Sequence, residues 1–186
     1  MTTTTPAAYE PTIRESPNRA AALTIGTIVL LVGACAFLAE NMGSFFDTTG
    51  AAFGFLNVNP ALVVIWVLSG AALLIAGASG SAPARTINGA VGLLFVVLGV
   101  AGFLVRDTEA NYLALNLGDD ITHLVAGALL VLTAIGLLFV VLGVAGFLVR
   151  DTEVNFLALN LGDDILHLVA GAVLLLTAIG AERRRR

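Results

Sequence analysis

Five long apolar blocks constrain the fold of this chain more than any other feature of its sequence. Each block is close to or above the roughly 18 residues that a helix needs to cross a bilayer, and only 12% of the chain is charged. Backbone polar groups in hydrocarbon must be satisfied within helices or closed barrels. We therefore predict an all-α, polytopic membrane helix bundle whose main partner is the lipid bilayer. The blocks are Ala21–Ala39, Pro60–Ser79, Asn88–Val105, Ile121–Val149 and Ile165–Ala181.

An almost identical repeat fills the C-terminal half of the chain. Residues 93–136 and 137–180 align without a gap over 44 positions, and only five of these positions differ. A recent tandem duplication is the simplest cause, and an error of sequence assembly is the alternative. The predicted organisation is a disordered tail (1–20), a four-helix membrane domain (21–136), a duplicated helical hairpin (137–180) and a basic tail (181–186).

A weaker repeat relates the two hairpins of the four-helix domain to each other. The pattern Asn-x6-Trp-x3-Gly that begins at Asn59 recurs as Asn-x6-His-x3-Gly from Asn116 and again from Asn160. The preceding helices share a glycine pattern that begins at Gly26 and Gly92. The repeating unit is therefore a helix, an outer loop and a returning helix. We expect the glycines to permit close contact between helices.

These features resemble the bacterial membrane family called domain of unknown function 4383. The resemblance rests on four helices, a glycine-rich first helix that ends in Phe-Leu, and the Asn-x-x-Asp-x-x-x-His-like entry that begins at Asn116. Two features depart from the family pattern: Trp66 stands where a histidine is often repeated, and the extra hairpin exceeds the four-helix plan. We expect Trp66 to pack against apolar neighbours or lipid. The resemblance implies a membrane fold and no known activity.

The arginines predict the orientation of the four-helix domain. Arg14, Arg19 and Arg85 fall on one side of the predicted membrane, and six acidic residues fall on the other. Positively charged residues favour the cytoplasmic side. We therefore predict a plasma-membrane protein with a cytoplasmic N-terminus. The acidic residues of the opposite side are Glu40, Asp47, Asp107, Glu109, Asp119 and Asp120.

The duplication creates a conflict over the number of spans. The block Ile121–Val149 joins the fourth helix to the copied one without a polar loop. A helix of this length reaches about 43 Å, against roughly 30 Å of hydrocarbon, whereas two crossings need about 40 residues. We favour one long tilted or kinked span and hence five spans. Six spans are the alternative, because they would keep the four terminal arginines in the cytoplasm.

Two acidic clusters with a histidine are the candidate sites. Asp119 and Asp120 lie four and three residues before His123, so the three side chains share adjoining parts of one helix face. Such a set could bind a divalent cation or relay protons. Aspartates at a helix start also cap its free amides and complement the helix dipole, and we favour this capping role. The copied cluster consists of Asp163, Asp164 and His167.

The sequence favours a scaffold or interaction protein over other functional classes. No span carries an acidic residue or an arginine at its middle, which disfavours ion-coupled transport. No G-x-S-x-G or H-E-x-x-H motif indicates an enzyme, and we predict no cofactor. The four terminal arginines indicate contact with anionic lipid rather than nucleic acid. We expect helix contacts between copies to form a homo-oligomer, and a metal- or proton-handling membrane protein is the alternative function.

Overall fold

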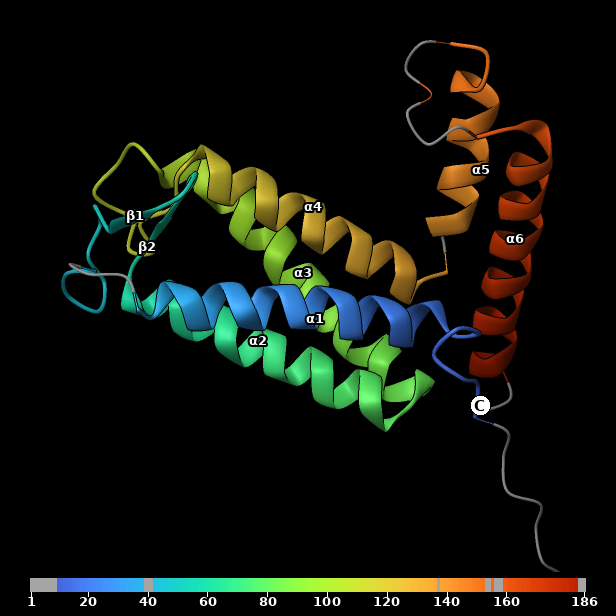
Figure 1. Ribbon diagram of the computed structural model, residues 1–186, viewed down its shortest axis with the longest axis horizontal. Helices are drawn as coiled ribbons and strands as arrows, with labels where there is room; N and C mark the ends of the chain where they lie inside the picture. Colours follow the sequence, from blue (N-terminus) through green and yellow to red (C-terminus); the bar gives the residue numbers. More distant parts are fainter. Residues whose placement is uncertain (1–9, 39–41, 137, 153–154, 156–158, 184–186) are drawn as a thin grey trace, which may run out of the picture.

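The computed structural model describes residues 10–38, 42–136, 138–152, 155 and 159–183. These residues form six helices and one two-stranded antiparallel hairpin (Figure 1). The predicted all-α architecture is confirmed. The elements are α1 (Pro17–Ala36), β1 (Ala51–Phe53), β2 (Leu56–Val58), α2 (Pro60–Ser79), α3 (Ser81–Val105), α4 (Leu117–Ala134), α5 (Leu138–Val149) and α6 (Leu161–Arg183).

Polar caps determine where the helices of the bundle begin. The Ser16 side chain accepts a hydrogen bond from the Arg19 amide, and Pro17 is the first residue of α1. Both features favour a helix start. Residues 17–20, which we predicted to belong to a disordered tail, are therefore helical, and residues 1–9 lie outside the described residues. Helix α3 likewise begins at Ser81, before the start at Asn88 that the apolar block predicted. The residues of its first turns are too polar to be counted in an apolar block.

Equivalent glycines bring the helices of each hairpin into close contact. A Cβ on Gly92 would lie 2.9 Å from the Gly127 carbonyl oxygen, and one on Gly127 would lie 2.7 Å from the Gly92 oxygen. In the first hairpin, a Cβ on Gly26 would lie 3.1 Å from the Gly70 oxygen. The same pair of repeat positions thus forms the tight crossing of α1 with α2 and of α3 with α4. The predicted packing role of these glycines is confirmed.

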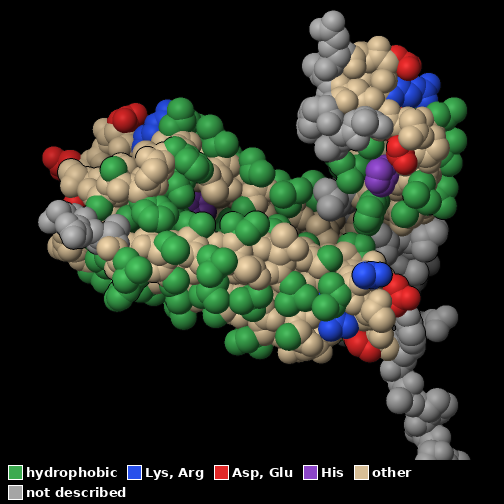
Figure 2. All heavy atoms as spheres, viewed as in Figure 1, with side chains coloured by type: hydrophobic (Ala, Val, Ile, Leu, Met, Phe, Trp, Pro, Cys, Tyr) green, Lys and Arg blue, Asp and Glu red, His purple; other side chains and the backbone are tan. Residues whose placement is uncertain are grey.

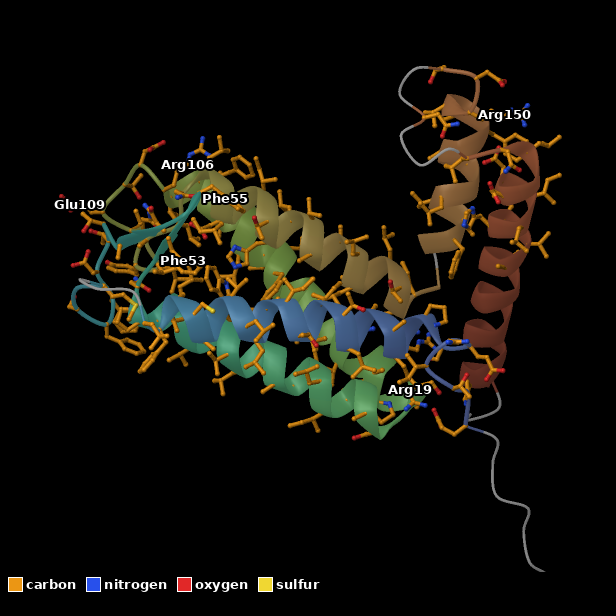
Figure 3. All side chains as sticks on the ribbon, in the orientation of Figure 1. Arg19, Phe53, Phe55, Arg106, Glu109 and Arg150 are labelled. Atoms are coloured by element: carbon orange, nitrogen blue, oxygen red, sulfur yellow. The ribbon has the colours of Figure 1, made fainter. Side chains whose placement is uncertain are left out.

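Arginines cap two helices at the end of the bundle where the N-terminus enters. The guanidinium of Arg19 donates from Nε to the Gly77 carbonyl of α2 at 3.0 Å, and that of Arg85 donates to the Ala134 carbonyl of α4 at 2.8 Å. Cations favour the negative ends of helices. Figure 3 places Arg19 at the opposite end of the bundle from Arg106 and the β-hairpin. Arg19 and Arg85 therefore lie at the same end of the bundle, as the orientation predicted from the sequence requires.

The N-terminal segment is fastened to the turn between α2 and α3. The backbone N–H and the hydroxyl of Ser81 donate to Glu10 Oε1 at 2.6 and 2.7 Å. These two hydrogen bonds, the backbone one first, hold the pKa of Glu10 below its usual value. This contact joins the chain before α1 to the start of α3.

The chain breaks between α4 and α5, so the continuous span that we predicted for residues 121–149 does not form. The last residue of α4 is Ala134, Gly136 has a φ of +73°, and α5 begins at Leu138. A positive φ suits glycine and does not continue a right-handed helix. Helix α5 has 12 residues and is about 18 Å long, which is shorter than the roughly 30 Å of hydrocarbon.

Four of the described helices, α1 to α4, are long and apolar enough to cross a membrane. Figure 2 shows hydrophobic side chains along the length of the bundle and charged ones towards its ends. Large apolar side chains such as Leu68, Ile75 and Leu104 are exposed on the helix surfaces, as lipid requires. The protein is a multi-pass membrane protein. Helices α5 and α6 pack together beyond the end of this bundle and run across its direction (Figure 1).

Candidate functional site

The entry to α4 is a reciprocal cap. Asn116 precedes the helix, and its side-chain oxygen accepts a hydrogen bond from the Asp119 amide at 3.0 Å. The Asp119 carboxylate in turn accepts a hydrogen bond from the backbone N–H of Asn116 at 3.1 Å. Each residue thereby satisfies a backbone donor that the first turn of a helix leaves free. The capping interpretation of Asp119 is confirmed.

Asp119 also holds the β-hairpin against α4. The same carboxylate oxygen, Oδ2, accepts a second hydrogen bond, from the backbone N–H of Asn57 in β2, at 3.1 Å. Nearby, the Asn116 amide group donates to the carbonyl oxygen of Phe55 at the hairpin turn, at 3.3 Å. Asp119 is fully buried. Its position fixes the hairpin over the start of α4.

Asp120 points to the other side and pairs with an arginine from the end of α3. Its Oδ2 lies 3.2 Å from Nη1 of Arg106, and its side chain is fully buried. The guanidinium of Arg106 also lies over the ring of Phe103, 5.1 Å from the ring centre. The second carboxylate oxygen faces Gly102, where a Cβ would overlap it. A buried charge needs such a partner because desolvation is costly.

His123 faces the centre of the bundle and pairs with Trp66 of α2. The indole N–H of Trp66 donates to Nε2 of His123 at 2.9 Å, and Nδ1 of His123 lies 2.8 Å from the Asp119 carbonyl oxygen. Because Nε2 accepts, we assign the ring proton to Nδ1, which then donates to that carbonyl. The ring of Phe95 packs edge-on against the imidazole, with the ring centres 5.2 Å apart. Both nitrogens of a neutral histidine are thus satisfied.

This pairing was missed by the sequence interpretation, which assigned Trp66 to packing or lipid contact. The repeat contains the signal that could have found it, because Trp66 and His123 occupy the same position of the two hairpins. When two repeated hairpins pack around a common centre, residues at equivalent positions of their helices face each other. The internal repeat therefore predicts the contact once the two hairpins are assumed to pack face to face.

The structure does not bring the three candidate ligands to one point. Asp119 is turned to the β-hairpin, Asp120 to Arg106 and His123 to Trp66. Among the described residues, which include all six candidates, no group of three His, Cys, Asp or Glu side chains is placed to hold a metal ion. Metal binding, the alternative to the favoured capping role, therefore stays a prediction that the directions of these three side chains do not support.

The copied cluster repeats the cap and the ion pair but not the histidine contact. The Asp163 carboxylate accepts a hydrogen bond from the backbone N–H of Asn160 at 3.2 Å, and Oδ2 of Asp164 lies 3.8 Å from Nη1 of Arg150. His167 stacks on Phe139 with ring centres 5.8 Å apart and planes inclined by 18°. The contacts within each hairpin are thus intrinsic to the 44-residue unit, whereas the histidine pairing requires α2.

One of the comparisons with known proteins gives a match. The model of the family described as domain of unknown function (DUF4383) matches residues 19–135, which is more than half of the chain. The chain belongs to this family. The predicted resemblance is confirmed, and the DUF4383 region corresponds to helices α1 to α4, while the copied hairpin lies beyond it. The comparisons with curated proteins and with solved structures give no match.

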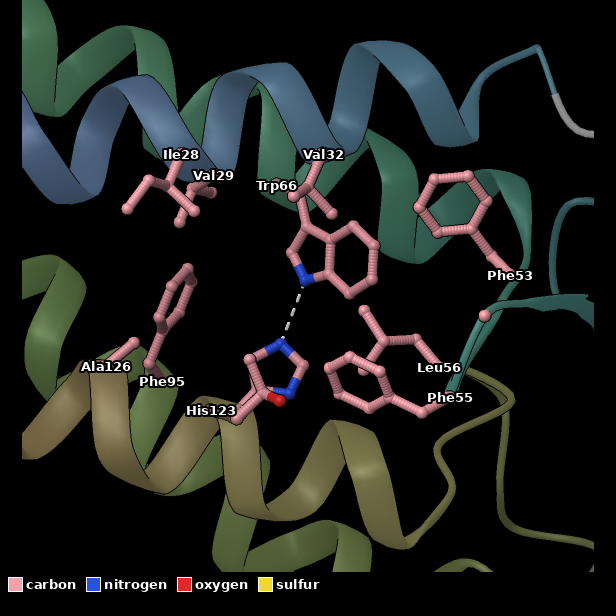
Figure 4. Close-up of a pocket in the computed structure, with 12 residues that line it drawn as sticks. Ile28, Val29, Val32, Phe53, Phe55, Leu56, Trp66, Phe95, His123 and Ala126 are labelled. Atoms are coloured by element: carbon pink, nitrogen blue, oxygen red, sulfur yellow. Dashed lines mark hydrogen bonds between the residues drawn. The ribbon is translucent and has the colours of Figure 1, made fainter.

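The DUF4383 region also contains an apolar recess that the sequence did not reveal. This cavity of about 390 Å³ lies between α1 and α4, and the turn of the β-hairpin covers one end of it (Figure 4). The Trp66–His123 pair and Phe95 line its inner wall. A second, polar recess of about 360 Å³ lies among the loops at the same end of the DUF4383 region, beside Arg106, Asn57 and Asn116.

Proposed function

We propose that this member of the DUF4383 family is a non-enzymatic scaffold or interaction protein of the membrane. The observation that carries the proposal is the set of contacts that the buried polar side chains at the start of α4 make with the rest of the fold. Asp119, Asp120 and His123 each contact a neighbouring element of the fold. Ionisable side chains inside membrane proteins commonly mark ion paths or catalytic centres, but here they connect helices and the hairpin. We place the interaction on the exposed apolar faces of the helices.

We further propose that these faces contact a second copy of the chain. Leu68 and Ile75 lie two turns apart on α2, and 64% and 68% of their surfaces are exposed. Helix association in membranes depends on close side-chain packing rather than on charge, and this face offers apolar side chains of that kind. The charges at the ends of the bundle would keep the contacting copies at the same depth.

Site-specific photocrosslinking in intact membranes tests this proposal. A crosslinker at position 68 or 75 should give one discrete adduct with the mass of two chains. A crosslinker at the buried Leu73 of the same helix should give none and serves as the control. The absence of any discrete adduct from both exposed positions would count against the proposal.

Metal analysis of the detergent-purified protein tests the alternative function. The scaffold proposal predicts no stoichiometric divalent cation. One cation per chain that disappears in both Asp120→Asn and His123→Ala would instead establish metal handling. Because the three side chains diverge, such a site would need a rearrangement of α4 or ligands from a second chain.

The proposed location is the plasma membrane, with the N-terminus in the cytoplasm. The arginines that cap α2 and α4 lie at the N-terminal end of the bundle, which supports this orientation under the positive-inside rule. Reporter fusions after Gly80 and after Glu109 test it. We expect cytoplasmic activity at Gly80 and external activity at Glu109, and the reverse pattern would overturn the orientation.

A further inference from the structure

The apolar recess of the bundle opens sideways towards the bilayer. Its mouth lies between α1 and α4, where the side chains of Ile28 and Thr122 are both exposed. Ala126 also lines it, and this residue follows the start of α4 by nine positions, or about 14 Å along the helix. The recess therefore lies at the depth of the hydrocarbon, in the half of the bundle nearest the β-hairpin (Figure 4).

The lining selects for hydrocarbon. Of its twelve residues, only Trp66, Thr122 and His123 carry a polar side-chain atom. The donor of Trp66 and Nε2 of His123 are occupied by each other, and Nδ1 of His123 faces the Asp119 carbonyl. Thr122 lies at the mouth rather than at the inner wall. A polar ligand would therefore lose its own hydration without finding partners inside the recess.

The dimensions of the recess restrict its occupant further. The cavity of about 390 Å³ falls within the roughly 300–1,000 Å³ of small-molecule sites. A transmembrane helix of a partner protein, about 10 Å across, would have to force α1 and α4 apart to enter. A hydrocarbon chain is slender enough to enter between the two helices, and lipid chains surround the mouth.

The β-hairpin closes the outer end of the recess. Phe53, Gly54 and Phe55 belong to its lining, and Phe53 pairs with Leu56 across the two-residue turn. The hairpin is held in this place by the Asn57 and Asn116 contacts described above. The head group of a lipid in this leaflet would lie at the level of the hairpin, outside the recess, and its acyl chain would run beneath these aromatic rings towards the centre of the bilayer.

We infer that the recess between α1 and α4 binds a single acyl chain of a membrane lipid from the leaflet nearest the β-hairpin. Filling the recess would restore the dispersion contacts that an empty apolar space lacks. The acyl chain would connect α1 to α4, the two helices that line the mouth. This inference goes beyond the scaffold proposal and does not depend on it.

Photolabelling with a lipid of defined structure tests the inference. The full chain would be placed in nanodiscs of phosphatidylcholine that carries a diazirine at the middle of one acyl chain. After irradiation, mass spectrometry would compare the labelling of residues 28–32 and 122–126 with that of Leu93 and Val97, which are exposed on α3 and report ordinary contact with bulk lipid. We expect the recess segments to be labelled several-fold more than this α3 face.

Two variants and a matched control make the experiment specific. Ala126→Phe should fill the recess, and Ile28→Trp should obstruct its mouth, so both should lower the labelling ratio several-fold. The copied hairpin provides the control, because Ala170 has the same neighbours in sequence as Ala126 and belongs to a helix that does not line the recess. Ala170→Phe should leave the ratio unchanged.

Two results would overturn the inference. They are equal labelling of the recess segments and of the α3 face in the natural protein, and unchanged labelling in Ile28→Trp. Ile28 is 56% exposed, so its replacement displaces little packed structure. This variant therefore decides the question even if Ala126→Phe fails to fold.

Discussion

Single glycines in this protein make room for specific polar atoms. Gly102 is the clearest case, because a Cβ there would overlap the Asp120 carboxylate that is held by Arg106. We expect Gly102→Ala to lower the free energy of unfolding by about 1–3 kcal/mol, the usual cost of overpacking. Thermal unfolding of the protein in detergent measures this loss.

Gly89 provides the control for this substitution in the same helix. A Cβ at Gly89 would meet only the Cβ of Ala134, at an ordinary 3.8 Å. Gly89→Ala should therefore be neutral or raise stability by up to about 1 kcal/mol, because alanine is the better helix former. Equal destabilisation by the two substitutions would show that Gly102 makes no special room for Asp120.

The hydrogen bond between Trp66 and His123 should appear as an energetic coupling. Trp66→Phe leaves Nε2 of His123 without a donor, and His123→Leu leaves the indole N–H without an acceptor. Each loss should cost about 1–3 kcal/mol. The double variant should cost less than the sum of the two, with a coupling of about 0.5–3 kcal/mol in chemical or thermal unfolding.

His167 is the natural comparison for this pair. It has the same neighbours in sequence, but it stacks on Phe139 and belongs to the hairpin that does not pack on α2. His167→Leu combined with Trp66→Phe should be additive. Coupling of Trp66 to His167, or none to His123, would contradict the described pairing.

The contact of Glu10 with Ser81 should depend on pH. Two donors from Ser81 favour the ionised carboxylate, so the pKa of Glu10 in the folded protein is lowered. The stabilisation is therefore complete above the unfolded-state pKa, about 4.3, and is lost as the pH falls through the lower folded-state value. Carboxyl NMR in micelles should show that Ser81→Ala raises the pKa of Glu10, since one donor is removed. No change would contradict the contact.

Among the secondary-structure elements, the β-hairpin depends on its contact with α4. Asp119 accepts the Asn57 amide and also caps its own helix, whereas Asp163 in the copy caps only its own helix. Asp119→Ala should accelerate hydrogen exchange of residues 51–58, and Asp163→Ala should not. Unchanged exchange in Asp119→Ala would show that other contacts hold the hairpin in place.

The sequence predicts helices better than it predicts their ends or their partners. The apolar block Pro60–Ser79 and α2 have the same bounds, because a cap and a proline begin the helix and apolar residues fill it. The starts of α1 and α3 were missed, since their first turns carry polar side chains. The hairpin was missed because strands of three residues leave no periodicity to detect.

The same limit applies to the candidate site. The cap at Asn116 and Asp119 is local, and spacing alone predicted it. The Trp66–His123 pair joins residues that are 57 positions apart, and the recess depends on how far α1 lies from α4. Spacing placed Asp119, Asp120 and His123 on adjoining parts of one helix face, but tertiary neighbours drew their polar atoms in three directions.

For the molecule as a whole, the duplication raises the question of which copy completes the bundle. Helices α1 and α2 form one hairpin, and the 44-residue unit supplies most of the second hairpin. The first copy supplies it in the structure, and α5 and α6 remain beside the bundle (Figure 1). The two copies differ at five positions only, so we expect their order along the chain, rather than their side chains, to decide which copy packs on α1 and α2.

Deletion of either copy should therefore give the same four-helix protein. Removing the 44-residue unit from the 186 residues leaves 142. Removal of residues 137–180 leaves α3 intact, and removal of residues 93–136 joins Gly92 to a second Leu-Leu-Phe-Val-Val run, so that the α3 sequence continues across the junction. When residues 93–136 are removed, His167 should take the place of His123 and pair with Trp66. We expect both shortened chains to unfold at similar temperatures in detergent, and Trp66→Phe should destabilise both by a similar amount. A shortened chain that folds only when the first copy is kept would mean that the five differing positions, rather than chain order, determine the packing on α1 and α2.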